Sequence, residues 1–362
     1  MDINYVELGS ICKKGSSNVA QKDLSDHKGK YPIYGASGFI MNVDFAHQNK
    51  PYIAVVKDGA GVGRVMLLPA NSSVIGTMQY ILPNDNVDID YLFYALQYMN
   101  LSKYYSGATI PHIYFKDYQR EKVLLPSLDI QRKKAEVLHK IDELKNLYNE
   151  YIVKFDTIIK SRFVEMFGNI NINDRDWDAL PLGDLCTIVR GGSPRPIVDY
   201  LGGTIPWIKI GDATEGDDIY LRSTKEFIIS EGIKKSRMVK AGSLIFANCG
   251  VSLGFARIIT FDGCIHDGWL AMEDIDGRLN KIFLLQSLNQ MTGNFRKMAP
   301  AGTQPNLNTT IMKAYMQILP PIKLQEEFIS FIENVNKSEL AVKASLEKLE
   351  TLKKSLMQQY FG

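Results

Sequence analysis

The stretch that decides the fold runs from residue 131 to residue 165 and reads QRKKAEVLHKIDELKNLYNEYIVKFDTIIKSRFVE. It contains no proline or glycine, and its apolar residues are spaced alternately by four and three positions, the pattern of a helix that packs along a partner helix. At about 1.5 Å per residue such a helix spans roughly 50 Å, which is too long for the core of a small domain. The predicted seam consists of Val137, Ile141, Leu144, Tyr148, Tyr151, Phe155 and Ile158.

A second stretch of this kind ends the chain, because residues behind position 109 recur 194 positions later. Gln131 recurs as Gln325, and the Phe-Gly pair at 167–168 recurs at 361–362. A constant offset indicates two copies of one module joined end to end. The other recurring residues are Thr109, Pro111, Leu125 and Pro126, which become Thr303, Pro305, Leu319 and Pro320.

The front of the module also recurs, but with a different offset. Leu8 and Pro32 return 174 positions later, whereas Gly59 returns 191 positions later as Gly250. The second copy therefore carries about twenty inserted residues, mostly between Pro206 and Gly250, while the helical part keeps its length.

These observations predict an α+β protein. It has two globular mixed α/β domains, residues 1–127 and 168–322, joined by two long antiparallel coiled-coil helices, residues 128–167 and 323–362, in a pseudo-two-fold arrangement. We expect the two ends of the chain to lie close together. Within the domains, the sequence predicts short strands at 51–56, 64–68, 243–247 and 255–260, and short helices at 90–99 and 281–291.

Composition excludes little. The chain has 362 residues, 45% of them hydrophobic, and a net charge of +2, so bulk charge gives no evidence for nucleic acid. The four cysteines, Cys12, Cys186, Cys249 and Cys264, lack C-x-x-C spacing and histidine partners, which argues against a metal site. We expect a cytoplasmic protein with no membrane association, because no apolar run reaches 18 residues.

Two glycine motifs resemble catalytic or nucleotide-binding sites in part. Residues 250–254 match the G-x-S-x-G nucleophile elbow of hydrolases, but that motif needs a following helix and the residues after it are strand-like. Residues 59–63 lack the G-x-G-x-x-G spacing of a phosphate loop. Both fit hairpin turns better, and the chain also lacks the Asn-Pro-Pro-Tyr tetrapeptide of amino-methyltransferases. We therefore predict a non-catalytic chain and keep a hydrolase as the disfavoured alternative.

The ordered set of motifs resembles the DNA-specificity subunit of type I restriction-modification systems. The resemblance covers essentially the whole chain, and the first copy is a variant that lacks the Ile-Pro-Trp and the opening tryptophan. Its motifs in the second copy are Trp177, LGD at 182–184, GGSP at 191–194, IPWI at 205–208, the glycines of 250–254, GTQPNL at 302–307, and LPP at 319–321 with Gln325 and Glu326. In the first copy they are YPIYGASG at 31–38, KDG at 57–59 and GATIP at 107–111.

The resemblance implies two target-recognition domains, each reading one half of a bipartite double-stranded DNA site, with the helices setting the unread gap. It also implies two methyltransferase (modification) subunits and a restriction endonuclease/translocase subunit as partners. S-adenosylmethionine and ATP would be bound by those partners, with no cofactor in this chain. A modification-only complex, or another defence complex, remains an open alternative.

Side chains with suitable chemistry in loops are candidates for DNA contact, since arginine and lysine read guanine and asparagine and glutamine read adenine. These candidates are Lys57, Arg64, Thr109, His112, Tyr114, Arg190, Ser193, Arg195, Lys209, Gln304 and Asn306. Thr109 and its counterpart Thr303 could instead cap turns. Trp207 and Trp269 are expected in the core.

A second apolar stripe runs beside the seam at seven-residue steps. It is a candidate partner-binding surface, although the protein's own globular domains could cover it equally well. The stripe consists of Leu138, Ile152, Ile159, Met166, Ile332, Leu346 and Tyr360.

Overall fold

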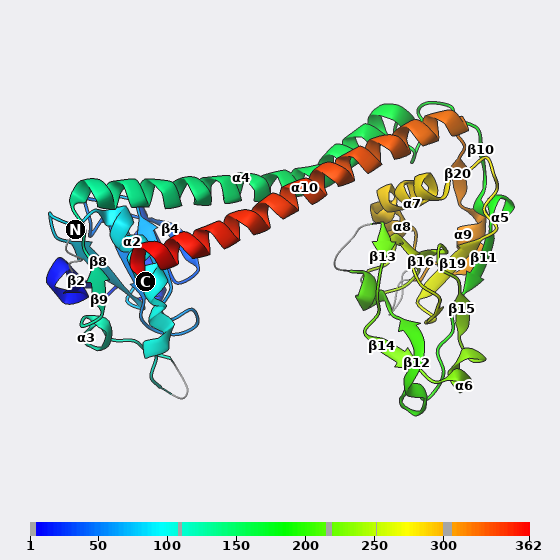
Figure 1. Ribbon diagram of the computed structural model, residues 1–362. Coiled ribbons are helices and arrows are strands. Elements are labelled where there is room, and N and C mark those ends of the chain that lie inside the picture. Colours follow the sequence, from blue (N-terminus) through cyan, green and yellow to red (C-terminus); the bar gives the residue numbers. More distant parts are fainter. Residues whose placement is uncertain (1–4, 108–110, 215–218, 251, 300–305) are drawn as a thin grey trace. The chain divides into compact units, whose positions relative to one another are not determined.

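The computed structural model describes residues 5–107, 111–214, 219–250, 252–299 and 306–362 (Figure 1). It divides into two compact units, one of residues 1–150 with 342–362 and one of residues 151–341. Each unit holds one globular domain and one stretch of each long helix, α4 (Leu128–Phe167) and α10 (Ile322–Phe361). Within the described ranges, each helix is too short or too polar to cross a lipid bilayer.

The globular domain of the first unit is built on a sheet of order β2–β8–β5–β6, with a smaller sheet of order β4–β3–β7 beside it. Strand β5 reads YIAVV and is wholly buried, because it pairs on both edges and is apolar throughout. The elements are β1 (Tyr5–Glu7), α1 (Leu8–Ile11), β2 (Cys12–Ser16), β3 (Tyr31–Gly35), β4 (Gly38–Val43), β5 (Tyr52–Val56), β6 (Val65–Leu68), β7 (Ser73–Val74), β8 (Met78–Pro83), α2 (Ile89–Met99), α3 (Phe115–Tyr118) and β9 (Lys122–Leu124).

The globular domain of the second unit repeats this topology. Its main sheet has the order β11–β19–β16–β17–β13, and its second sheet has the order β14–β12–β18–β15. The elements are β10 (Ala179–Pro181), α5 (Leu182–Leu185), β11 (Thr187–Arg190), β12 (Leu201–Ile208), β13 (Tyr220–Leu221), β14 (Glu226–Ile228), α6 (Ser230–Ile233), β15 (Arg237–Val239), β16 (Leu244–Ala247), β17 (Ala256–Ile259), β18 (Gly263–Ile265), β19 (Trp269–Glu273), α7 (Lys281–Gln290), α8 (Thr292–Met298), α9 (Thr309–Ala314) and β20 (Met316–Ile318).

Matching pairings identify equivalent elements in the two domains. The opening strand pairs antiparallel with the last one in both, as β1 with β9 and β10 with β20. The parallel pair β3–β7 corresponds to β12–β18. Strands β13 and β15 have no counterpart among the described residues of the first domain, and both lie between Pro206 and Gly250. This is where the sequence predicted the insertion, and the predicted internal repeat is confirmed.

The two long helices run antiparallel within each unit. In the first unit, Lys353 on α10 forms an ion pair with Asp142 on α4 at 2.6 Å, and Glu350 pairs with Lys145 at 3.4 Å. From one ion pair to the next, the residue number rises along α4 and falls along α10, so the two helices are antiparallel. In the second unit, the ring of Phe328 on α10 packs against the rings of Phe163 and Phe167 on α4.

The predicted seam on α4 is only half right. Ile141 is buried and Tyr148 and Phe155 are half-buried, as expected for positions that face a partner. The remaining four residues of the predicted seam, which are also spaced by seven, are exposed, so their assignment to the seam was wrong. They are Val137 (40% exposed), Leu144 (42%), Tyr151 (41%) and Ile158 (44%).

The predicted docking stripe is covered by the protein itself at two positions. Leu138 is fully buried against Tyr91 and Tyr94 of α2, and Ile332 is buried in the core of the second domain. For these two residues the partner-binding prediction was wrong, because the globular domains compete for the same helix face. The remaining members are half-buried, with Ile159 and Met166 against the second core, Tyr360 against the α2 cluster, and Ile152 and Leu346 elsewhere on the helices.

A buried glutamine fastens the start of each long helix to its globular domain. In α4, the Oε1 atom of Gln131 accepts a hydrogen bond from the Asp88 N–H at 2.8 Å, and its Nε2 donates to the Pro126 and Asn86 carbonyls at 2.8 and 3.2 Å. Asp88 is in turn the N-cap of α2, since its carboxylate accepts from the Tyr91 N–H at 3.0 Å.

Gln325 of α10 repeats this arrangement. Its Oε1 accepts from the N–H of Asn280, the N-cap of α7, at 2.8 Å, and its Nε2 donates to the Pro320 and Arg278 carbonyls at 2.8 and 2.9 Å. Both glutamines are almost wholly buried, so these bonds fix the helix against the domain without competition from water.

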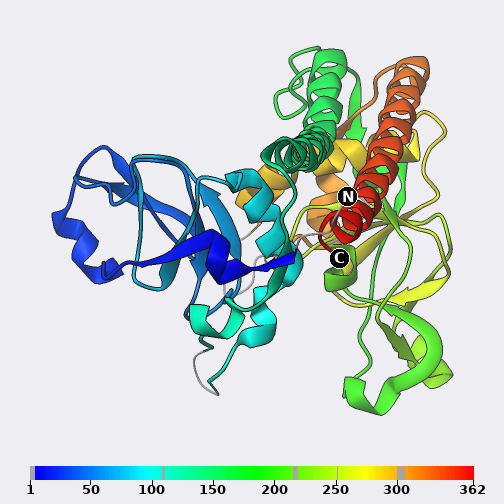
Figure 2. The ribbon, with the colours of Figure 1, turned by 60° about the vertical axis from the view of Figure 1, so that its left-hand side comes forward.

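The ends of the described chain meet in the first unit, as the sequence predicted. The Tyr5 hydroxyl donates a hydrogen bond to the Gly362 carbonyl at 3.1 Å. Figure 2 shows the dark-blue strand β1 reaching the red end of α10. The last phenylalanine, Phe361, packs its ring against Tyr91 of α2.

Replacing Gln325 by leucine should destabilise the protein, because the substitution leaves the Asn280 N–H and two carbonyls buried without partners. Since each unsatisfied buried polar group costs about 1–3 kcal/mol, the free energy of unfolding should fall by at least about 2 kcal/mol. Urea denaturation followed by circular dichroism measures this. The matched control is Gln359→Leu at an exposed position of α10, and equal stability of the two variants would contradict the role of Gln325.

Candidate functional site

Two DNA-contact candidates of the first domain, Lys57 and His112, contact a carboxylate that sequence reasoning missed. Asp58 lies in the turn between β5 and β6, and its Oδ1 contacts the His112 Nδ1 at 2.7 Å. The Lys57 ammonium pairs with the other carboxylate oxygen. Partial burial acts to raise the pKa of Asp58, but hydrogen bonds from Lys57 and His112 outweigh it, so the pKa lies below its ordinary value.

The other candidates of this domain are less closely grouped. Arg64 closes the same β5–β6 turn and donates from Nη1 to the Ala36 carbonyl at 2.8 Å. Tyr114 is half exposed at the N-cap of α3, with the Lys116 ammonium over its ring. Thr109 lies outside the described residues.

The same place in the second domain carries different side chains. A backbone bridge joins Asp58 to His112 in the first domain, and its counterpart joins Cys249 to Asn306 in the second. The Asn306 Oδ1 accepts a hydrogen bond from the Asn248 Nδ2 at 3.3 Å. Gln304 lies outside the described residues. The scaffold is therefore shared, while the polar groups it presents are not.

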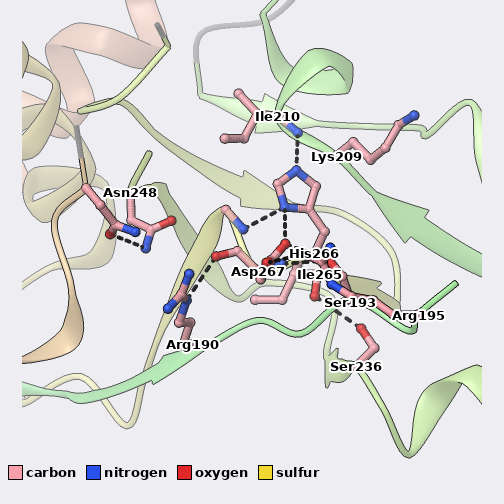
Figure 3. A network of polar contacts seen from close by, with 12 residues as sticks. Arg190, Ser193, Arg195, Lys209, Ile210, Ser236, Asn248, Ile265, His266 and Asp267 are labelled. Carbon is pink, nitrogen blue, oxygen red and sulfur yellow. Dashed lines mark hydrogen bonds and ion pairs between the residues drawn. The ribbon is translucent and has the colours of Figure 1, made fainter. Parts of the chain in front are cut away.

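Three further candidates of the second domain, Arg190, Ser193 and Arg195, converge on one turn, residues 266–268, between β18 and β19 (Figure 3). The GGSP loop passes close against this turn, since a Cβ on Gly191 would lie 2.1 Å from the His266 carbonyl oxygen. Glycine is required there by this close approach. The loop thus brings Ser193 to Asp267, where its hydroxyl donates to the carboxylate at 2.6 Å.

Two arginines flank Asp267, which sequence reasoning also missed. Arg190, at the end of β11, donates from Nε to the Asp267 carbonyl at 3.0 Å. Arg195 pairs its Nη2 with the carboxylate at 3.4 Å. Partial burial acts to raise the pKa of Asp267, but the Ser193 hydrogen bond and nearby positive charges outweigh it, so the pKa lies below its ordinary value.

A cleft of about 560 Å³ opens beside this carboxylate. Lys209, at the end of β12, reaches it and forms an ion pair with Glu226. Trp207 lines the cleft but is 2% exposed, and Trp269 is fully buried, so both tryptophans belong to the core as expected. The cleft is lined by Ser193, Pro194, Arg195, Pro196, Ile197, Trp207, Lys209, His266 and Asp267.

His266 supports the turn as a neutral ring. Its Nε2 faces the Ile210 N–H at 3.2 Å and its Nδ1 faces the Gly268 N–H at 2.6 Å. A neutral ring can accept a hydrogen bond from one of these donors, whereas a protonated ring carries N–H groups on both nitrogens and can accept from neither. Burial lowers its pKa below 6.5; the Lys209 charge acts in the same direction, and Asp267 and Asp212 oppose it.

The G-x-S-x-G motif occupies a hairpin. Strand β16 precedes it and the antiparallel strand β17 follows it, with the Gly254 N–H donating to the Ala247 carbonyl at 2.8 Å. Gly250 and Gly254 have φ values of 77° and 101°, which glycine adopts readily. Because a nucleophile elbow needs a helix after the turn, this geometry rejects the hydrolase alternative.

The family model for the type I restriction modification DNA specificity domain matches residues 1–154 and 174–351. The chain belongs to this family. It is a DNA-specificity subunit with two such domains, and the resemblance inferred from its motifs is confirmed.

Two similar sequences and a similar solved structure are also specificity subunits. The MjaIX specificity subunit of Methanocaldococcus jannaschii is 25% identical over 281 residues, covering 70% of this chain and 63% of that protein. The MjaVIII specificity subunit of the same organism is 22% identical and covers 98% of this chain and 91% of its own length. The crystal structure of a type I S subunit from M. genitalium has a TM-score of 0.60 at 16% identity, covering 100% of this chain and 97% of that one, and so shares the fold.

Acidification should destabilise the protein through His266. Because its folded-state pKa lies below 6.5, the unfolded chain binds the proton more readily, and stability should fall as the pH drops below about 6.5. His266→Asn, which keeps an acceptor for the Gly268 N–H, should weaken this dependence in urea denaturation at pH 7.5 and 5.5. His139→Asn, on the exposed face of α4, is the control. An unchanged pH dependence in the His266 variant would refute this role.

Proposed function

We propose that each globular domain reads one half of a bipartite double-stranded DNA site and that α4 and α10 set the unread gap. The observation that carries this proposal is the shared bridge with different side chains, Asp58 with His112 in one domain and Cys249 with Asn306 in the other. A duplicated scaffold that presents different donors and acceptors suits two readers of different base sequences. Two linked readers bind far more tightly than either alone, because the second contact is intramolecular.

The helices also supply the surface that we propose for the partner subunits. Val137 and Leu144 in the first unit, and Tyr151 and Ile158 in the second, are apolar, exposed and spaced by seven residues along α4. Exposed apolar side chains at helical spacing favour a protein partner. We assign this surface, rather than the buried stripe, to two methyltransferase subunits, and we propose a restriction endonuclease/translocase subunit as a further partner.

The chemistry would then reside in the partners. We propose that the methyltransferase subunits bind S-adenosylmethionine and the endonuclease subunit binds ATP, while this chain is non-catalytic and positions both on DNA. A modification-only complex would use the same two readers. The two cases differ in whether unmethylated DNA is cleaved once the endonuclease subunit and ATP are added.

Genome-wide mapping of methylated adenines should reveal one bipartite sequence that depends on this chain. Seven residues inserted after Glu150 in α4 and after Ala341 in α10 should lengthen the helices by about 10 Å and widen the gap by about three base pairs, with both half-sites unchanged. An insertion in α4 alone is the control, since it breaks the pairing of the helices. An unchanged gap in the double insertion would refute the proposal that the helices measure the spacer.

A charge placed on the exposed stripe should block assembly. Leu144→Asp should abolish co-purification with the methyltransferase subunits, because a carboxylate would have to be buried in an apolar contact. The matched control is Val153→Asp on the same helix, where Val153 is 74% exposed and off the seven-residue stripe. Assembly by both variants, or by neither, would show that this stripe is not the docking surface.

A further inference from the structure

Asp267 occupies the centre of the polar cluster in the second domain (Figure 3). Its carboxylate contacts Ser193 through Oδ1 and Arg195 through Oδ2, and its main chain contacts Arg190 and Ser193. The Asp267 side chain is 42% exposed and that of Arg195 is 79% exposed, so both are accessible to a ligand over the cleft.

We propose that Asp267 is a specificity-determining residue: it orients Arg195 toward the O6 and N7 atoms of a guanine in the half-site read by the second domain, and its carboxylate accepts a hydrogen bond from a neighbouring cytosine amino group. This inference rests on the proposed function and adds a base identity to it. The second half-site should therefore contain a G·C pair at this position.

The Asp267 carboxylate indicates that this cluster contacts a DNA base and not a backbone phosphate. Although partial burial acts to raise the pKa of Asp267, the Ser193 hydrogen bond and the flanking positive charges outweigh it and hold the pKa below its ordinary value, so the carboxylate is ionised at neutral pH, and an anion in this place repels the DNA backbone. Base edges in the major groove are uncharged, and cytosine presents an amino donor there that carboxylates accept. A cluster built only to grip phosphate would gain from removing this group.

The geometry of Arg195 fits guanine. A guanidinium has five N–H donors in a planar fork, and Arg195 uses Nη2 for Asp267, which leaves donors for a bidentate contact. An arginine held by a carboxylate also loses less side-chain freedom on binding than a free one. Ser193 holds the carboxylate from the other side, and its Oγ accepts from the Asp267 N–H at 3.3 Å, so the reading group is set before DNA arrives.

The first domain contains a parallel arrangement. Asp58 lies between Lys57 and His112 at the position equivalent to Cys249. The N–H of Asn248, beside Cys249, donates to the Gly268 carbonyl at 3.0 Å, so the turn of Cys249 lies against the turn that carries Asp267. Both domains thus place a carboxylate among cationic or polar candidate readers in this region, in the β5–β6 turn of the first domain and in the β18–β19 turn of the second. This recurrence favours a role in reading over an isolated structural ion pair.

The test uses the complete methyltransferase complex containing the full chain. Methylation rates are measured on a panel of duplexes in which each base pair of both half-sites is changed in turn. Asp267→Asn and Arg195→Ala should lower the discrimination at the same G·C pair of the second half-site by about tenfold or more, the size expected for one bidentate base contact. Discrimination in the first half-site should stay unchanged in the same reactions.

The control is Asp262→Asn. It removes a carboxylate that forms an ion pair with Lys240 and lies outside this cluster. It should leave discrimination at every position intact. Arg195→Ala alters an exposed side chain, so it decides the question even where Asp267→Asn folds poorly. The salt dependence of binding separates a phosphate contact, whose loss reduces the slope, from a base contact, whose loss changes discrimination.

A uniform loss of activity on all duplexes, or a second half-site without a G·C pair, would overturn the role of Asp267. Failure of the proposed function would look different, because the wild-type chain would then show no bipartite preference in the same panel.

Discussion

The structure depends on one buried side chain used twice. Gln131 and Gln325 each accept a main-chain N–H from the cap of a short helix and donate to two carbonyls, one of which lies in the Leu-Pro segment just before the long helix. A glutamine supplies one acceptor and two donors on a flat group, so a single residue satisfies three buried main-chain groups. An apolar residue would pack there but would leave those groups unpaired.

This constraint links the helices to the readers within each unit. The short helices α2 and α7, whose N-caps the glutamines hold, also carry the aromatic surfaces on which the long helices pack. In the first unit Tyr91 contacts Phe361, and in the second unit Phe283 stacks with Phe163. Each long helix therefore begins at a glutamine in one unit and ends at a phenylalanine in the other. A long helix fastened to a globular domain at each end suits the spacer role that we propose for it.

The sequence predicted those features that leave a periodic or repeated trace. The long helices, α2 and α7, the turns at Gly59 and Gly250 and the place of the insertion between Pro206 and Gly250 were predicted, whereas the strands β13 and β15 that the insertion forms were not. The face of α4 that packs against the globular domain was not predicted. Val137 and Leu138 begin two equally apolar stripes that are offset by one residue, and the sequence does not distinguish them. The choice between them was made by Tyr91 and Tyr94 of α2, which bury Leu138, and no periodicity within the helix encodes that contact.

The candidate DNA-contact residues were predicted by type, but their arrangement was not. The sequence indicates Arg190, Ser193 and Arg195 because arginine and serine in loops suit DNA contact, whereas nothing in the sequence pattern indicates Asp267, which lies more than 70 residues further along the chain. In the fold, the Asp267 carboxylate contacts Arg195 and the Asp267 main-chain carbonyl contacts Arg190, so this acidic residue supports both arginines. The duplicated framework keeps its glutamines and glycine turns, while the carboxylate among the readers comes from β5–β6 in one domain and β18–β19 in the other. Recognition can therefore diverge between the two halves without disturbing the hydrogen bonds that hold the helices in place.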